Sequence, residues 1–156
     1  MRVLENLDAL PAWIGREVAC SDWLAVDQSR IQGFADASGD QQWIHTDPER
    51  ALRESPYKST IAHGYLTLSL LPHLLESCLR IDGVGMAINY GLDRVRFPAP
   101  LLVGQRARAR LALERLESVA GGMQAHWAAT VELEHGDKPA CVAQMLVRYY
   151  PSQTTA

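Results

Sequence analysis

The stretch that decides the fold is TIAHGYLTLSLLPHLLESCL, residues 60–79. Its apolar side chains are too dense for the single apolar stripe of a surface helix. They fall on more than one side of the helix: Ile61, Leu66, Leu68, Leu70, Leu71, Leu74, Leu75 and Leu79. A helix that is apolar all round is stable only where other elements surround it. We therefore expect a helix from Thr60 to Leu79 in the interior of the fold.

The second half of the chain supplies those surroundings, because the apolar period changes to two after Gly83. One face of the clearest strand carries Met123, Ala125, Trp127, Ala129, Val131 and Leu133, and most of the other carries Gln124, His126, Thr130, Glu132 and Glu134. Gly121-Gly122 and Gly136-Asp137 lie where antiparallel strands need turns, and a last strand is expected over residues 140–149. An apolar sheet face must be covered. The sequence predicts an α+β fold, one domain over residues 1–156, with an antiparallel sheet wrapped around a long central helix.

Ahead of the central helix, the pattern predicts a strand over residues 17–26 and then a helix capped by Asp27 and ended by Gly39. Residues 40–47 show neither period and are expected to form a loop. Pro48 then opens a short helix that continues to about Arg53, because proline is favoured in a first helical turn.

Composition excludes several classes of function. The 15 Lys+Arg and 18 Asp+Glu give a formal net charge of −3, without general attraction to nucleic-acid phosphates. An odd number of cysteines without CxxC spacing indicates buried thiols, not disulfides or zinc ligands: Cys20, Cys78 and Cys141. The N-terminus has acids where a signal peptide needs an apolar run. The uncharged stretch 59–75 contains two histidines and a proline, which favours a buried helix over a membrane span. We expect a soluble, cytoplasmic protein.

The chemistry is concentrated in FADASGDQQWIHTDP, residues 34–48. Asp40 and His45 stand five residues apart in the expected loop, and two adjacent acid/base groups are what proton transfer requires. The alternative is that Asp40 forms an Asx turn and His45 is a packed imidazole. Downstream, Gly64 lies at the start of the buried helix, where unpaired N–H groups and the helix dipole suit a developing oxyanion.

These residues resemble the MaoC-like hydratases, the (R)-specific enoyl-CoA hydratases of the hot-dog fold. Gly39-Asp40 with His45-Thr46-Asp47-Pro48 is similar to the family signature, and Ile61-Ala62-His63-Gly64 is similar to the segment that opens the central helix. A third match is Val95-Arg96-Phe97-Pro98-Ala99-Pro100, followed by Gly104. Many members have Asn-Pro where this chain has Gln42-Trp43, although related short members also carry tryptophan there.

The resemblance implies reversible hydration of a trans-2-enoyl-CoA to an (R)-3-hydroxyacyl-CoA. It assigns Asp40 and His45 as the catalytic pair and the Gly64 N–H as the oxyanion donor. Gln42, Trp43 and Tyr65 are expected to contact the substrate. No metal or redox cofactor is implied, and the acyl-CoA substrate is the only small-molecule partner. Such proteins are usually homodimers, and edge pairing across a two-fold axis would cover an open sheet edge.

Two other functions remain open at this point. A hot-dog acyl-CoA thioesterase usually carries its carboxylate on the central helix, but residues 59–75 contain no Asp or Glu. The second is a non-catalytic acyl-CoA binder or nodulation-type accessory protein, against which the intact Asp40/His45 pair argues. A metal site formed by His45, Asp47 and His63 is disfavoured, because Asp47 before Pro48 is better explained as a helix N-cap.

The remaining basic residues give weaker predictions. The stripe of Arg106, Arg108 and Arg110 is either a site for CoA phosphates or, more commonly, a solvated strand face. Arg53, Lys58 and Arg96 are weaker candidates for the phosphates. Among the histidines, His63 is expected to shape the loop beside Gly64, His73 to be a core or interface residue, and His126 and His135 to have no role.

Overall fold

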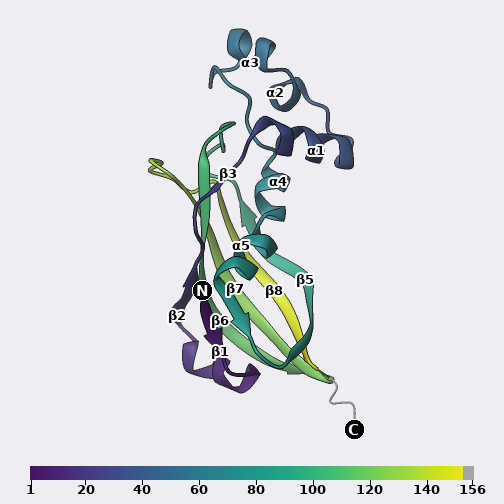
Figure 1. Cartoon of the computed structure of the whole chain (residues 1–156), viewed down its shortest axis with the longest axis vertical. Coiled ribbons are helices and arrows are strands. Elements are labelled where there is room, and N and C mark those ends of the chain that lie inside the picture. Colours follow the sequence, from purple (N-terminus) through teal and green to yellow (C-terminus); the bar gives the residue numbers. More distant parts are fainter. Residues whose placement is uncertain (153–156) are drawn as a thin grey trace.

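A computed structural model describes residues 1–152. A long, curved antiparallel sheet forms one side of the molecule, and the helices lie along its inner face and above one end (Figure 1). The strand order is β2-β6-β7-β8-β5, and β3 also pairs with β6. The strands are β2 (Arg16–Cys20), β3 (Leu24–Ala25), β5 (Val84–Arg96), β6 (Arg106–Val119), β7 (Gly122–Leu133) and β8 (Cys141–Pro151). The predicted α+β architecture is confirmed.

The central helix is buried as predicted, but it is neither continuous nor as long as predicted. It consists of α4 (Gly64–Ser69) and α5 (Leu71–Cys78), and it begins four residues after Thr60. Pro72 lies in the first turn of α5 and has no N–H to donate to the preceding turn, so it divides the helix near Leu70. The segment before Gly64 is extended, and Ile61 forms an isolated bridge with Leu102.

The alternation on β7 places its apolar residues against this helix. The side chains of Ala125, Trp127 and Val131 are fully buried, whereas the alternate residues face outward. Cys78 and Cys141 are buried free thiols, and Cys20 is partly exposed. Burial raises the pKa of the Cys141 thiol to about 11. The sheet and helix therefore share one core.

The helices before the core follow their capping signals. In α1 (Gln28–Ser38), the Asp27 carboxylate accepts from the Arg30 N–H, and Gly39 ends the helix with φ +79°. In α3 (Pro48–Glu54), Asp47 accepts from the Arg50 N–H at 2.9 Å. Both predicted boundaries are confirmed.

The expected loop over residues 40–47 is wrong in one part, since α2 (Trp43–Thr46) interrupts it. The Thr46 hydroxyl donates to the carbonyls of Gln41 and Gln42, and the Asp47 N–H donates to the Trp43 carbonyl. A helix of one turn is too short to show a 3.6-residue apolar period, so periodicity could not reveal it.

The predicted strand over residues 17–26 is divided into β2 and β3. Between them, the Ser21 N–H donates to the Ala109 carbonyl and the Ser21 hydroxyl accepts from the Ala109 N–H, both at 2.9 Å. Sequence periodicity also missed β1 (Arg2–Leu4), the 3-10 helix η1 (Leu7–Trp13) and β4 (Leu79–Ile81). Strand β1 pairs in parallel with β4, and Leu10 of η1 is buried in the core.

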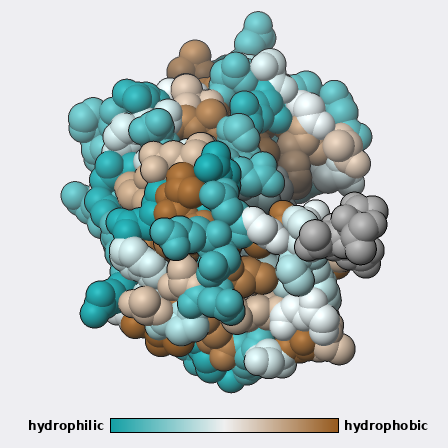
Figure 2. Space-filling view, turned by 60° about the horizontal axis from the view of Figure 1, so that its bottom comes forward, coloured by the Kyte–Doolittle hydropathy of each residue, from teal (hydrophilic) through white to brown (hydrophobic). Residues whose placement is uncertain are grey.

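The surface is mixed in character. In the face shown in Figure 2, hydrophobic residues form separate patches among hydrophilic ones. On β5 nearly every residue is exposed, including Met86, Ile88, Tyr90 and Leu92, and within residues 1–152 this strand pairs on one side only, with β8. No helix in the described part of the chain has the length and apolar character needed to cross a membrane.

Candidate active site

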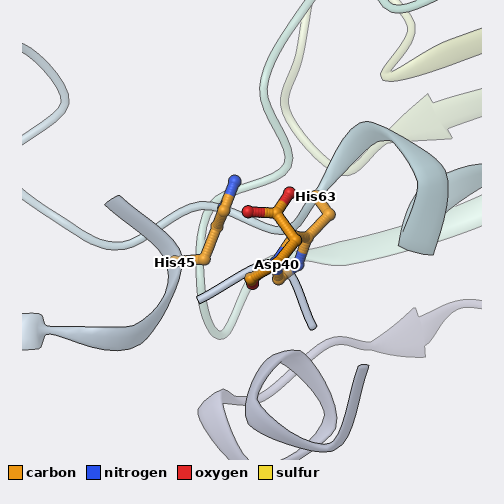
Figure 3. A group of neighbouring side chains, drawn as sticks. All are labelled: Asp40, His45 and His63. Atoms are coloured by element: carbon orange, nitrogen blue, oxygen red, sulfur yellow. The ribbon is translucent and has the colours of Figure 1, made fainter. Parts of the chain in front are cut away.

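Three side chains from separate segments meet above the N-terminal end of α4 (Figure 3). Asp40 follows the glycine that ends α1, His45 lies on α2, and His63 immediately precedes α4. One potential ligand atom of each lies within 4.8 Å of those of the other two. The structure therefore brings the predicted pair Asp40/His45 together and adds His63 to it.

The His45 ring is fixed in one tautomer. Its Nδ1 lies 2.7 Å from the Ile61 carbonyl oxygen. Because a carbonyl only accepts, Nδ1 carries a proton, and the neutral ring therefore has its free lone pair on Nε2. Desolvation lowers the pKa of His45, while the bond to Ile61 and the nearby Asp40 charge oppose that change and the neighbouring His63 adds to it. A neutral imidazole with an unprotonated Nε2 is suited to accept a proton.

The backbone of His45 is held by Gln28, which the sequence analysis missed. The Gln28 amide donates to the His45 carbonyl at 2.7 Å, and the hydroxyl of the buried Thr60 donates to the Gln28 side-chain oxygen at 2.5 Å. The Ile61 N–H donates to the Ile44 carbonyl at 3.1 Å. Nothing in the sequence separates Gln28 from Gln32, one turn further along the same helix, so no local signal identifies it.

The Asp40 carboxylate takes part in a turn of its own loop and also faces the surface near His45. One carboxylate oxygen accepts from the Gln42 N–H at 3.3 Å, which is the Asx turn foreseen as the alternative to chemistry. The residue is nevertheless exposed and close enough to affect His45. The turn therefore orients the carboxylate without burying it.

His63 interacts with both members of the pair. Its Nε2 lies 2.9 Å from the Asp40 backbone carbonyl, and its ring stacks on His45 with centroids 3.7 Å apart. The disfavoured metal set included Asp47, which instead caps α3. A set with Asp40 in its place has poor ligand geometry, because the two rings lie only 27° from parallel and ring lone pairs point within the ring planes.

Gly64 is the first residue of α4, so no carbonyl within the helix accepts its N–H. A Cβ added there would lie 2.9 Å from the Phe97 ring, which packs against this glycine. Phe97 is partly exposed, and its ring meets the exposed Tyr65 edge-on at 6.2 Å between centroids. A hollow of about 260 Å³ lies beside them, lined in part by Tyr57, Ala62, Gly64, Phe97 and Leu101.

The other expected substrate contacts do not line that hollow. Gln42 is the exposed N-cap of α2, and Tyr65 is 72% exposed. Trp43 is half-buried, and the Arg50 guanidinium lies 4.5 Å from its ring centroid. Their assignment as substrate contacts stays a prediction.

Two adjoining apolar hollows lie further along the central helix. Their volumes are about 230 and 260 Å³, and they share Pro72 and Asn89. Both lie between α5 and strands β5 and β8; the first also reaches α4, and the second also reaches β4. Their lining includes Leu68, Leu71 and Leu75 on the helices and Leu92, Met145 and Val147 on the strands.

The arginine stripe of β6 is occupied by carboxylates. Arg106 pairs with Glu134 at 3.0 Å, Arg108 with Glu132 at 2.7 Å, and Arg110 with Glu132 at 2.6 Å. This favours the solvated strand face over a phosphate site. Arg96 and Lys58 donate to the backbone carbonyls of Val95 and Arg53, respectively.

The remaining histidines differ from one another. His73 is exposed on α5, so a core position for it is wrong. His135 lies in the turn after β7 with φ +65°. His126 is buried on the outer face of the sheet among ionic side chains, which the alternation of β7 did not indicate.

Comparisons with known proteins show the family of the chain. The model of the MaoC-like domain family matches residues 10–135. The chain is 50% identical over 150 residues to 3-hydroxyacyl-thioester dehydratase Z of Mycobacterium tuberculosis, covering 96% of this chain and 99% of that protein. It is 44% identical over 143 residues to nodulation protein N of Rhizobium leguminosarum bv. viciae, covering 90% and 89%.

Among solved structures, the unliganded (R)-hydratase PhaJ1 of Pseudomonas aeruginosa superposes with a TM-score of 0.71 at 22% identity, covering 89% of this chain and 83% of that one. The family model and the 50% identical relative define a dehydratase, which is a hydro-lyase enzyme, and the solved structure shows the hot-dog fold. The chain belongs to the MaoC-like domain family.

Proposed function

We propose that this enzyme adds water reversibly to a trans-2-enoyl-CoA to give an (R)-3-hydroxyacyl-CoA. The observation that carries this proposal is the juxtaposition of Asp40 with a neutral His45 whose Nε2 is free. The names of the relatives, a 3-hydroxyacyl-thioester dehydratase and an (R)-hydratase, support the same class of substrate.

The reaction needs two proton transfers. The oxygen of water bonds to C3 of the enoyl chain while one of its protons passes to the Asp40/His45 pair, and the pair delivers one proton to C2. The net change is addition of one water molecule, and the reverse sequence expels it. Each positioned acid/base group contributes a factor of ~10²–10⁴ to the rate. The reaction needs no metal or redox cofactor.

Negative charge develops on the thioester oxygen during this addition. The Gly64 N–H is our proposed donor to it, because it is unpaired within α4 and lies next to the His63 that contacts both acid/base groups. Loss of one such donor lowers a rate by ~10²–10³. The apolar hollows along α4 and α5 suit the acyl chain.

We also propose that the enzyme is a homodimer formed through β5. This strand exposes apolar side chains at Met86, Ile88 and Leu92 and has one unpaired edge within the described residues. Pairing with the same strand of a second copy covers that edge under two-fold symmetry. Sedimentation of the wild type and of Ile88→Asp tests this: the wild type is expected at twice the monomer mass and the variant at a lower mass. A monomeric wild type contradicts it.

Incubation with crotonyl-CoA tests the proposed reaction. We expect loss of the absorbance of the conjugated thioester and formation of the (R)-3-hydroxy product, identified by chiral analysis. Release of free CoA thiol without hydration indicates the thioesterase instead. Binding without turnover of saturated or unsaturated acyl-CoA indicates the non-catalytic accessory protein.

A further inference from the structure

His63 is a buried polar residue that the proposed chemistry does not use as an acid or base. It is 2% exposed, it precedes the first residue of α4, and its side chain does not cap that helix. Its contacts are directed instead at the two groups that carry the proposed reaction.

The first contact fixes which nitrogen of the His63 ring donates a hydrogen bond. Nε2 lies 2.9 Å from the Asp40 backbone carbonyl, which only accepts, so Nε2 carries the proton. Nδ1 is buried without a hydrogen-bond partner in the described structure. The His63 side chain therefore acts as a donor, and its one hydrogen bond is made to the residue bearing the carboxylate.

The second contact is made by the ring face. His63 stacks on His45 with ring centroids 3.7 Å apart, while Phe34 lies 5.0 Å from its centroid. His45 is bound through Nδ1 to Ile61, two residues before His63 in the chain. One imidazole thus supports the His45 ring and holds the Asp40 backbone beside it.

Packing alone does not explain a histidine at position 63. A phenylalanine fills a similar space and stacks on His45 without burying an unpaired nitrogen, which costs folding free energy. A histidine at this position leaves Nδ1 without a partner but supplies the Nε2–H bond to the Asp40 carbonyl, which phenylalanine cannot form. Buried polar groups without partners are uncommon in native proteins and call for such an explanation.

We propose that His63 is a positioning residue for the hydration reaction, which holds the Asp40 backbone in place against the His45 ring. This inference rests on the proposed function. Because the Asp40 carboxylate is otherwise exposed on a loop, loss of the bond lets it move away from His45. Small displacements of a catalytic group are costly, since a shift of ~1 Å can lower a rate by ~10²-fold.

Two substitutions separate the hydrogen bond from the packing. His63→Phe keeps a stacking ring and removes the donor, whereas His63→Gln keeps an amide N–H near the position of Nε2 and removes the ring. We expect His63→Phe to lower kcat by about 10- to 100-fold with KM little changed and without loss of thermal stability. We expect His63→Gln to retain at least about a third of wild-type kcat.

The exposed His73 supplies the matched control, since His73→Phe makes the same chemical change outside the site and is expected to leave kcat unchanged. Wild-type kcat in His63→Phe overturns the proposal. Equal losses in both His63 variants also overturn it, because they show that the ring matters and the hydrogen bond does not.

A measurement on the wild type separates this inference from the proposed function. Nitrogen NMR of the imidazoles should show a proton on Nε2 of His63 and a proton on Nδ1 of His45. This result is expected whether or not crotonyl-CoA is the substrate. A His63 ring without a proton on Nε2 contradicts the positioning role even in an active enzyme, whereas the expected protons in an enzyme without hydratase activity contradict only the proposed function.

Discussion

Two buried clusters in this molecule contain histidine, and the hydrogen-bond partners of the histidines differ between them. His45 and His63 at the head of the central helix are bound to backbone carbonyls, at Ile61 and Asp40. His126, on the outer face of the sheet, is surrounded by side chains. Arg115 and Gln124 lie within 3.3 Å of its ring nitrogens, and Glu117 lies 3.4 Å from Nε2.

The two clusters differ in whether a ring nitrogen is left without a hydrogen-bond partner. A carbonyl partner fixes the tautomer and leaves the other nitrogen of His45 without a partner, ready to accept a proton. Both ring nitrogens of His126 already have polar neighbours, so that ring has no free position for a reactant. Burial of a histidine therefore does not identify a reactive group, and neither does an unpartnered nitrogen that is itself buried, such as Nδ1 of His63.

The strongest test removes the acid/base groups. Asp40→Asn keeps the acceptor for the Gln42 N–H and should preserve the loop, yet we expect kcat to fall at least ~10²-fold. His45→Ala should fall by a similar factor. The control in the second cluster is Asp93→Asn, 3.7 Å from His126, which should leave turnover of crotonyl-CoA unchanged. Retention of more than about half the wild-type rate in either site variant removes that residue from the mechanism.

The next test concerns the oxyanion donor. Gly64→Ala is expected to lower kcat by at least ~10-fold, because a Cβ beside the N–H displaces the thioester. The new Cβ also meets the Phe97 ring at 2.9 Å, so part of the effect arises from the protein itself. The pair Gly64→Ala with Phe97→Ala separates the two causes. Recovered turnover in the double variant assigns the loss to Phe97, and continued loss places the thioester against Gly64.

A smaller effect is expected where His45 is held through its backbone. Gln28→Ala leaves the buried Thr60 hydroxyl and the His45 carbonyl without their partner, at a cost of ~1–3 kcal/mol in stability. We expect kcat to fall about 10-fold with KM little changed. Gln105 bridges the Leu102 N–H and the Glu134 carbonyl, so Gln105→Ala is the matched control. Equal kinetic losses in both variants would show a general loss of stability.

Gln28 also shows the limit of inference from sequence. The core could be predicted because density of leucine over residues 60–79 and alternation over residues 123–133 each express burial directly. Asp40 and His45 could be predicted because they lie in one short segment. The contacts of Gln28 and His63 span 17 to 32 residues of chain, and no local pattern encodes such distances.

The division of the central helix had a local signal in Pro72, but the apolar density of the segment outweighed it. Burial and continuity are separate properties of a helix. The leucines determine that the segment lies inside the sheet, whereas the missing N–H of one proline determines where the hydrogen bonding is interrupted.

The pH dependence of the rate should follow the lowered pKa of His45. Desolvation lowers the pKa of His45, so the neutral base persists below its ordinary value of 6.5. The value of kcat/KM should therefore fall on acidification only below pH 6.5. Because the folded state binds the proton less readily than the unfolded one, the contribution of His45 to stability is complete above 6.5 and is lost as the pH falls further. The pH dependence of kcat/KM in the wild type and of thermal stability in His45→Gln checks both statements.

The smallest expected effect is none, on removal of metal ions. The Asp40, His45 and His63 atoms lie within 4.8 Å of each other, a spacing that a metal ion would also allow. Nδ1 of His45 and Nε2 of His63 are committed to carbonyls, and the stacked rings do not direct their remaining lone pairs at one point. Activity measured after exhaustive chelation should equal that of the untreated enzyme. A lost rate that zinc restores would mean that a bound ion rearranges these rings, and the hydrogen bonds to Ile61 and Asp40 would then describe only the metal-free protein.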